Sequence, residues 1–148
     1  MKNQIWWVTG ASSGIGAALA KALSARGAKL ILSGRNVESL EAVARDLAGE
    51  SLVLPFEATD FAALPAIVEQ AQNWAGPVYG LVNNAGISQR SLAIETDFSV
   101  YQRIVDVDLL APIALTQLLL PAMVREGAGQ IIGISSVAGI AGVPLRSA

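Results

Sequence analysis

The sequence predicts an α/β protein with a doubly wound parallel sheet in three α/β/α layers. Strand-like apolar runs alternate with amphipathic helical patterns along the whole chain, and a glycine-rich turn joins the first strand to the first helix. Hydrophobic residues make up 53% of the chain and charged residues 15%, which is typical of a sheet buried on both faces.

The elements follow one another in a regular order. We expect strands at about residues 4–9, 29–33, 51–56, 78–83 and 130–135, and helices at about 14–26, 37–48, 60–74 and 97–125. Right-handed crossovers between such units place ligands at the carboxyl ends of the strands, where the winding reverses. The 148 residues show neither a repeat nor a linker, so we expect a single domain.

Composition excludes several kinds of site. The chain contains neither cysteine nor histidine, which removes disulfides, thiol nucleophiles, Cys/His metal sites and His-based triads. A net charge of −2 without long basic clusters does not favour a nucleic-acid partner. Polar residues interrupt the longest apolar run, residues 109–123, and the start lacks a secretory signal. We therefore expect a cytoplasmic protein with no metal and no membrane partner.

The turn at residues 9–16 (Thr-Gly-Ala-Ser-Ser-Gly-Ile-Gly) predicts a phosphate-binding site. Glycine suits a tight turn and lets the main chain approach a pyrophosphate. A helix starting near Ser13 would direct its free N–H groups and its positive end at the phosphates. A P-loop hydrolase or a flavodoxin-like protein is a weaker interpretation, because no Gly-Lys-Ser/Thr follows the glycines.

The end of the second strand predicts which dinucleotide is bound. An NAD-selective site places a carboxylate there, whereas a guanidinium matches the 2′-phosphate of NADP. Residues 33–36 contain no carboxylate and include Arg35. We therefore expect NADP, with NAD possible; alternatively, Arg35 stacks on the adenine or faces water.

Three segments resemble motifs of the short-chain dehydrogenase/reductase family. Residues 9–16 resemble its TGxxxGxG cofactor motif, residues 83–86 (Asn-Asn-Ala-Gly) its NNAG motif, and residues 129–139 its fifth strand with the catalytic serine. The resemblance covers the whole chain. It implies a Rossmann fold, hydride transfer between NADP(H) and an alcohol or carbonyl substrate, and a homo-oligomer joined through the fourth helix.

The resemblance also assigns roles to individual residues. Ser136 would orient the substrate oxygen, and Asp108 stands where the family has its catalytic asparagine. The cofactor would be contacted by Gly10, Ser12, Ser13, Gly14, Ile15, Gly16, Arg35, Glu57, Ala58, Asn84, Ala85, Gly86 and Ile134.

Some positions leave alternatives open. Glu57 replaces the family's usual Asp at the end of the third strand, and either reaches the adenine amino group or faces solvent; Asp60 looks like the N-cap of the next helix. Asp108 is either a partly protonated relay, with its pKa raised by desolvation, or a cap for a kink near Pro112. For Ser136, the alternative to a catalytic role is that its hydroxyl only forms a hydrogen bond with the backbone at the end of the strand.

The family's general acid/base tyrosine and its lysine partner are not found in this sequence. Counted from Ser136, the tyrosine would fall just after Ala148, beyond the approach at residues 143–147, and neither Tyr79 nor Tyr101 is followed by a suitably spaced lysine. Loss of general acid–base catalysis costs about 10²–10⁴ in rate. We therefore expect residues 1–148 to be an incomplete NAD(P)-binding domain of a longer enzyme, nearly inactive alone. The alternative is a non-catalytic dinucleotide-binding module.

Overall fold

The computed structural model describes residues 1–142 and 144–145. Its strands form one parallel sheet in the order β3-β2-β1-β4-β5. They are β1 (Ile5–Thr9), β2 (Lys29–Ser33), β3 (Ser51–Val53), β4 (Gly80–Asn83) and β5 (Gln130–Gly133). Because β1 pairs with both β2 and β4, the chain winds first to one side of β1 and then to the other. The doubly wound sheet expected from the sequence is thus confirmed.

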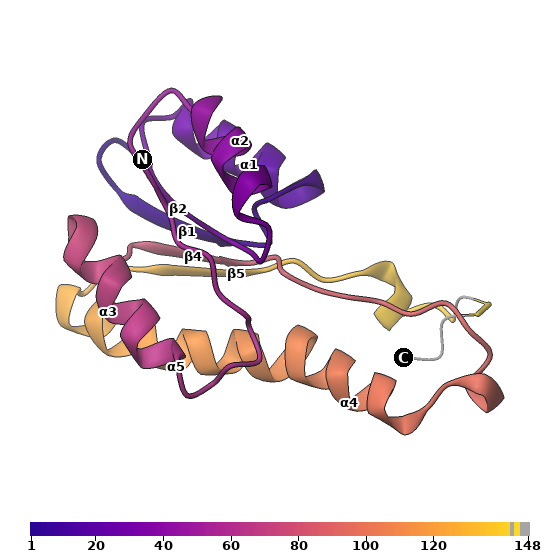
Figure 1. Cartoon of the computed structure of the whole chain (residues 1–148). Coiled ribbons are helices and arrows are strands. Elements are labelled where there is room, and N and C mark those ends of the chain that lie inside the picture. The colour runs from indigo at the N-terminus through magenta and orange to yellow at the C-terminus, as the bar shows by residue number, and fades with distance from the viewer. Residues whose placement is uncertain (143, 146–148) are drawn as a thin grey trace.

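Helices cover the two faces of the sheet. Helices α1 (Gly14–Ser24) and α2 (Val37–Arg45) lie on one face, and α3 (Leu64–Ala75) and α5 (Ala111–Glu126) lie on the other (Figure 1). Helix α4 (Phe98–Val105) continues the line of α5 beyond the carboxyl ends of the strands. The layer that contains α3 and α5 therefore extends, through α4, past the carboxyl ends of the strands, where a ligand is expected.

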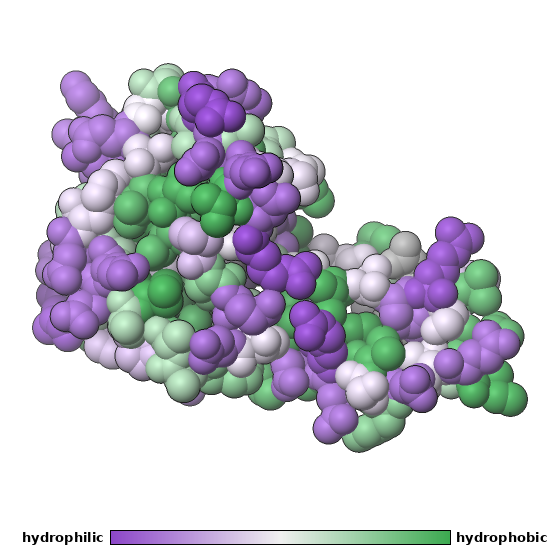
Figure 2. Space-filling view, viewed as in Figure 1, coloured by the Kyte–Doolittle hydropathy of each residue, from purple (hydrophilic) through white to green (hydrophobic). Residues whose placement is uncertain are grey.

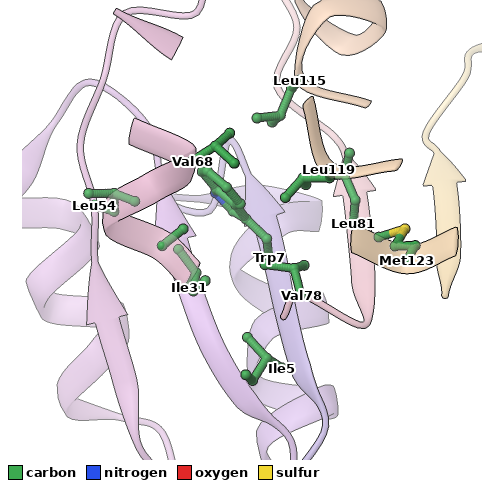
Figure 3. Packing of buried hydrophobic residues seen from close by; sticks show 11 residues of the cluster. Ile5, Trp7, Ile31, Leu54, Val68, Val78, Leu81, Leu115, Leu119 and Met123 are labelled. Carbon is green, nitrogen blue, oxygen red and sulfur yellow. The ribbon is translucent and has the colours of Figure 1, made fainter. Parts of the chain in front are cut away.

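The core consists of two clusters, one on each face of the sheet. Successive residues of β1 point to opposite faces, so Trp6 packs towards α1 and α2 while Trp7 packs towards α3 and α5 (Figure 3). Trp7 Nε1 donates to Ser33 Oγ at 2.8 Å, and that hydroxyl donates to the Leu54 carbonyl at 2.6 Å. These bonds satisfy the buried side chains of Trp7 and Ser33 and connect β1, β2 and the residue after β3, whereas the buried Trp6 Nε1 has no hydrogen-bond partner among the described residues.

The third unit differs in detail from the expectation. Strand β3 ends at Val53, and α3 begins at Leu64 with Ala63 as its N-cap. Asp60 Oδ1 accepts the Ala63 N–H at 3.2 Å, so it stabilises the turn before the helix. The interpretation of Asp60 as the helix N-cap is wrong.

The fourth helix contains a π-helical turn, η2 (Asp106–Leu110), between α4 and α5. The Ala111 N–H donates to the Asp106 carbonyl, one residue further back than in an α-helix. Pro112 follows directly and has no N–H for the Asp108 carbonyl. The proline therefore explains why the helix widens here.

Length and composition alone would allow the helix from Phe98 to Glu126 to cross a membrane, although the interrupting polar residues suggested otherwise. One side of α5 is buried against the sheet through Leu115, Leu119 and Met123. Core helices of layered proteins pass the same test, so this helix is weak evidence for a span.

The β5 edge of the sheet is exposed. All four residues of β5 are exposed, and Ile131 and Ile132 are 43% and 39% accessible. Within the described residues, no strand pairs with its outer edge. Figure 2 shows further hydrophobic surface, mixed with polar residues, between the two helical layers. Of the approach at residues 143–147, only Pro144 and Leu145 belong to the described residues.

Candidate functional site

A cleft of about 470 Å³ lies at the carboxyl ends of the strands. Its walls come from the turn after β1, the ends of β2 and β3, the loop after β4 and one side of the α4–α5 helix. This is the place where the winding of the sheet reverses, between β1 and β4.

Steric constraints at the three glycines of the turn explain why a residue without a side chain is needed there, and the constraints differ from one position to the next. Gly10 and Gly14 have φ values of +63° and +55°, which L side chains rarely adopt. A Cβ on Gly10 would lie 2.8 Å from Ala85 Cα, and a Cβ on Gly16 would overlap the Gly10 carbonyl oxygen. A Cβ on Gly14 would meet no atom within 4 Å, so the main chain there faces open space.

The N-terminus of α1 opens onto the cleft. Ser13, Gly14 and Ile15 line it, and the Ser13 side chain makes no capping hydrogen bond within the part of the chain that the structure describes. No acidic residue occupies the first turn of α1. The free N–H groups and the positive end of the helix dipole therefore favour an anion at this point.

A buried hydroxyl fixes the turn against the loop after β4. Thr9 Oγ1 donates to the Val82 carbonyl at 3.2 Å and accepts the Asn84 and Ala85 N–H groups, both at 3.0 Å. Asn84 Nδ2 in turn donates to the Thr9 and Gly10 carbonyls at 3.0 and 3.2 Å. Thr9 was not among the predicted site residues, although it opens the glycine motif.

At the other end of the cleft, Arg35 and Glu57 face each other. Arg35 Nη1 lies 4.0 Å from Glu57 Oε2, and Thr59 Oγ1 donates to Glu57 Oε1 at 3.3 Å. Both Arg35 and Glu57 line the cleft, together with Ala58. The pairing of Glu57 with Arg35 is an arrangement that the sequence did not suggest.

Asp108 lies in the π-helical turn, beside the cleft. Its Oδ1 accepts the Ile87 N–H at 2.8 Å, which connects η2 to the loop after β4. Partial burial raises the pKa of Asp108 above its ordinary value of 3.8, and the hydrogen bond from Ile87 opposes this rise. The carboxylate therefore holds the loop, and the two roles expected from the sequence, a proton relay or a cap for a kink, stay predictions.

Ser136 and Ile134 do not belong to the cleft lining, although Ile134 is hydrogen-bonded to Asn83, which does. Ser136 caps the short helix η3 (Val137–Gly139), where its Oγ accepts the Ala138 N–H at 3.2 Å. The Ile134 N–H extends the pairing of β4 with β5 by donating to the Asn83 carbonyl at 2.9 Å. Among the described residues, the cleft lining includes neither of them, nor Gly16 or Asp108. The other predicted cofactor contacts all line it: Gly10, Ser12, Ser13, Gly14, Ile15, Arg35, Glu57, Ala58, Asn84, Ala85 and Gly86.

The α4–α5 helix contributes a wall that the sequence analysis missed. Arg103, Val107, Ala111 and Leu115 all line the cleft. Their regular spacing of four residues places them along one side of a helix, which is a signal present in the sequence. The helix thus adds an apolar wall to the cleft, and Arg103 adds a second cation besides Arg35.

The cleft can therefore hold an elongated anionic ligand. An anion fits at the N-terminus of α1, a guanidinium lies at the end of β2, and an apolar helix face forms the opposite wall. Over residues 1–142 and 144–145, no three His, Cys, Asp or Glu side chains are close enough together to bind a metal ion.

Comparison with known proteins agrees with this arrangement. The family model for short chain dehydrogenases matches residues 4–148. The chain is 40% identical to dehydrogenase/reductase SDR family member 7B of Mus musculus, in an alignment that covers 100% of this chain and 48% of the relative. It is 39% identical to dehydrogenase/reductase SDR family member 7 of Homo sapiens, over 98% of this chain and 45% of that protein. The chain thus spans about half the length of these curated relatives.

A solved structure is similar over nearly the whole chain. It is a metagenomic short-chain oxidoreductase in complex with NADP, with a TM-score of 0.93 and 34% identity. The match covers 99% of this chain and 68% of that one.

Proposed function

Since the chain belongs to the short-chain dehydrogenase family, we propose that it binds NADP(H) in the cleft and that the whole protein transfers a hydride between this cofactor and an alcohol or carbonyl substrate. The family consists of oxidoreductases that use a nicotinamide dinucleotide, and the similar solved structure contains NADP. The observation that carries the proposal is the glycine turn, which presents the N-terminus of α1 to the cleft.

The residues present fit a dinucleotide. The open space over Gly14 leaves room for a pyrophosphate against the main chain, and the N–H groups at residues 12–15 would bind it. Arg35 would bind the 2′-phosphate, which favours NADP over NAD. Asn84, Ala85 and Gly86 would border the ribose and the nicotinamide. When bound, NADP(H) supplies the hydride donor or acceptor.

The chain's own side chains would position the reactants. Val107 and Ala111 provide an apolar wall that excludes water from one side of the cleft. Ser136 would orient the substrate oxygen, because a hydroxyl that accepts the Ala138 N–H can still donate its own proton. Asp108 would keep the loop after β4 in place and, when protonated, would take part in a proton relay.

The 148-residue chain alone is expected to have little or no activity. Neither a tyrosine nor a lysine lines the cleft among the described residues. Without a tuned acid/base, alcohol–carbonyl interconversion loses about 10²–10⁴ in rate. The second candidate function is a non-catalytic dinucleotide-binding module, which the same cleft would also serve. Consumption of NADPH with a panel of carbonyl compounds, measured on the whole protein, separates the two.

The complete protein is proposed to be a cytoplasmic homo-oligomer. Leu109, Ile113, Leu120 and Val124 expose apolar side chains along the η2–α5 helix, which would be buried at a subunit contact. Light scattering after size-exclusion chromatography measures the molar mass and so tests the proposed oligomeric state. A monomer at micromolar concentration would contradict it.

Cofactor binding can be tested by fluorescence titration. Trp6 and Trp7 are buried in β1, directly before the turn, and energy transfer from them to a reduced nicotinamide reports occupancy of the cleft. We expect saturable transfer with NADPH, weaker binding of NADH and no competition by FMN. Absence of saturable binding of either nicotinamide dinucleotide would contradict the proposed function.

A further inference from the structure

The pair of Arg35 and Glu57 lies at the rim of the cleft, where the adenosine end of the dinucleotide is proposed to bind. Arg35 Nη1 and Glu57 Oε2 are 4.0 Å apart, with side chains 66% and 42% accessible. Both residues line the cleft. The guanidinium that would bind a 2′-phosphate therefore already has an anionic partner.

The backbone holds Glu57 in this place. The Phe56 N–H donates to the Gly34 carbonyl at 3.2 Å, which joins the residue before Glu57 to the residue before Arg35. The Asp60 N–H donates to the Glu57 carbonyl at 3.1 Å, and the Thr59 hydroxyl donates to Glu57 Oε1. The backbone bonds thus fix the main chain of Glu57, and the Thr59 hydroxyl orients one carboxylate oxygen while the other lies towards Arg35.

We propose that Glu57 narrows the preference for NADP over NAD, because its carboxylate competes with the 2′-phosphate of NADP for the Arg35 guanidinium. The inference rests on the proposed function. To bind Arg35, the 2′-phosphate of NADP must displace the Glu57 carboxylate. The phosphate then lies close to this carboxylate, and the two negative charges repel each other. NAD carries an uncharged 2′-hydroxyl instead, so Glu57 does not act against it in this way.

Glu57→Gln tests the proposal, because glutamine keeps the size and the hydrogen bond from Thr59 while removing the charge. Dissociation constants for NADPH and NADH are measured by tryptophan-to-nicotinamide energy transfer on the unaltered chain and the variant. At low ionic strength we expect the variant to bind NADPH about two- to fivefold more tightly, with NADH unchanged within about twofold. The gain should disappear at about 1 M salt, where charges are screened beyond about 3 Å.

Two matched variants complete the design. Glu69→Gln removes an equal charge from the exposed side of α3, outside the cleft lining, and should change neither constant. Arg35→Gln should weaken the binding of NADPH but not of NADH. In the double variant, Glu57→Gln should increase the affinity for NADPH less than it does in the unaltered chain. Circular dichroism of each variant confirms that the fold is retained.

The outcomes separate this inference from the proposed function. An equal weakening of both dinucleotides in Glu57→Gln would mean that Glu57 contacts the adenine, and would overturn the inference. An unchanged NADPH-to-NADH ratio in Glu57→Gln, with NADPH weakened in Arg35→Gln, would overturn the inference alone. Failure of the unaltered chain to bind either dinucleotide would overturn both.

Discussion

At the residue scale, the hydroxyl of Thr9 is the centre of the site. A single buried oxygen bonds one carbonyl and two N–H groups, and so holds the strand end, the glycine turn and the loop after β4 in one arrangement. A buried backbone group that loses its partner costs about 1–3 kcal/mol. The stability of the turn therefore depends on this one side chain.

Replacement of Thr9 by valine should destabilise the chain by about 2–4 kcal/mol, because valine has the same shape but cannot bond the three backbone groups. Thr9→Ser is the control, since serine keeps the hydroxyl and should cost less than about 1 kcal/mol. Urea denaturation measures both. A larger loss in Thr9→Ser than in Thr9→Val would show that the methyl group, not the hydroxyl, stabilises the turn.

Asp108 should make stability depend on pH. Burial raises the pKa of Asp108 in the folded chain, so the folded state binds this proton more tightly than the unfolded state does. The resulting contribution to stability is fully present below the ordinary pKa of 3.8 and is lost as the pH rises through the raised value. In Asp108→Asn, the new amide side chain does not titrate and keeps an oxygen for the Ile87 N–H.

The free energy of unfolding of Asp108→Asn should therefore rise relative to that of the unaltered chain as the pH increases from about 4, and then level off. Urea denaturation at a series of pH values measures the difference. A difference that is constant over the whole series would contradict the raised pKa.

At the element scale, the turn between β1 and α1 uses its glycines for different purposes. Gly16 allows α1 to pack against the turn, since a Cβ would overlap the Gly10 carbonyl oxygen. Gly14 combines a left-handed backbone with a position on the cleft lining. Substitutions at the two positions should have different effects.

Gly16→Ala should destabilise the chain by about 2–3 kcal/mol through overpacking. Gly14→Ala should cost only about 1–2 kcal/mol of backbone strain, and its methyl group should nevertheless prevent most NADPH binding. Gly139→Ala is the control, because a Cβ there meets no atom within 4 Å and the residue lies outside the cleft lining. Thermal denaturation and the fluorescence titration give the two readouts. Unimpaired NADPH binding in Gly14→Ala would contradict the proposed position of the pyrophosphate.

Most elements, and the part of the site that is contiguous in the sequence, could be predicted. The glycine turn and the Asn-Asn-Ala-Gly segment contain their own local signals, and both line the cleft. The pairing of Glu57 with Arg35 depends on how the β2 and β3 ends lie together, which no local pattern specifies. The π-helical turn was missed because hydrophobic spacing does not distinguish it from an α-helix, although Pro112 indicates a disturbance.

At the scale of the whole molecule, the cleft exists only because three separate regions meet at one edge of the sheet. The turn after β1, the loop after β4 and the α4–α5 helix contribute to it from positions far apart in the sequence. The two core clusters on opposite faces of the sheet hold these regions together. A ligand that contacts all three should therefore stabilise the entire fold.

NADPH at about 100 times its dissociation constant should raise the free energy of unfolding by about 2.7 kcal/mol. Thermal denaturation with and without NADPH measures this as an increase in Tm. At the same NADPH concentration, the increase in Tm should be much smaller in Gly14→Ala. An equal increase in the variant would mean that NADPH binds elsewhere.

The position of the pyrophosphate is tested most directly by a crystal structure of the chain grown with excess NADP. We expect the pyrophosphate against the N–H groups of residues 12–15, at the start of α1, and the 2′-phosphate beside Arg35. A cleft that stays empty or is filled by side chains, or a dinucleotide bound away from the glycine turn, would contradict the proposed site.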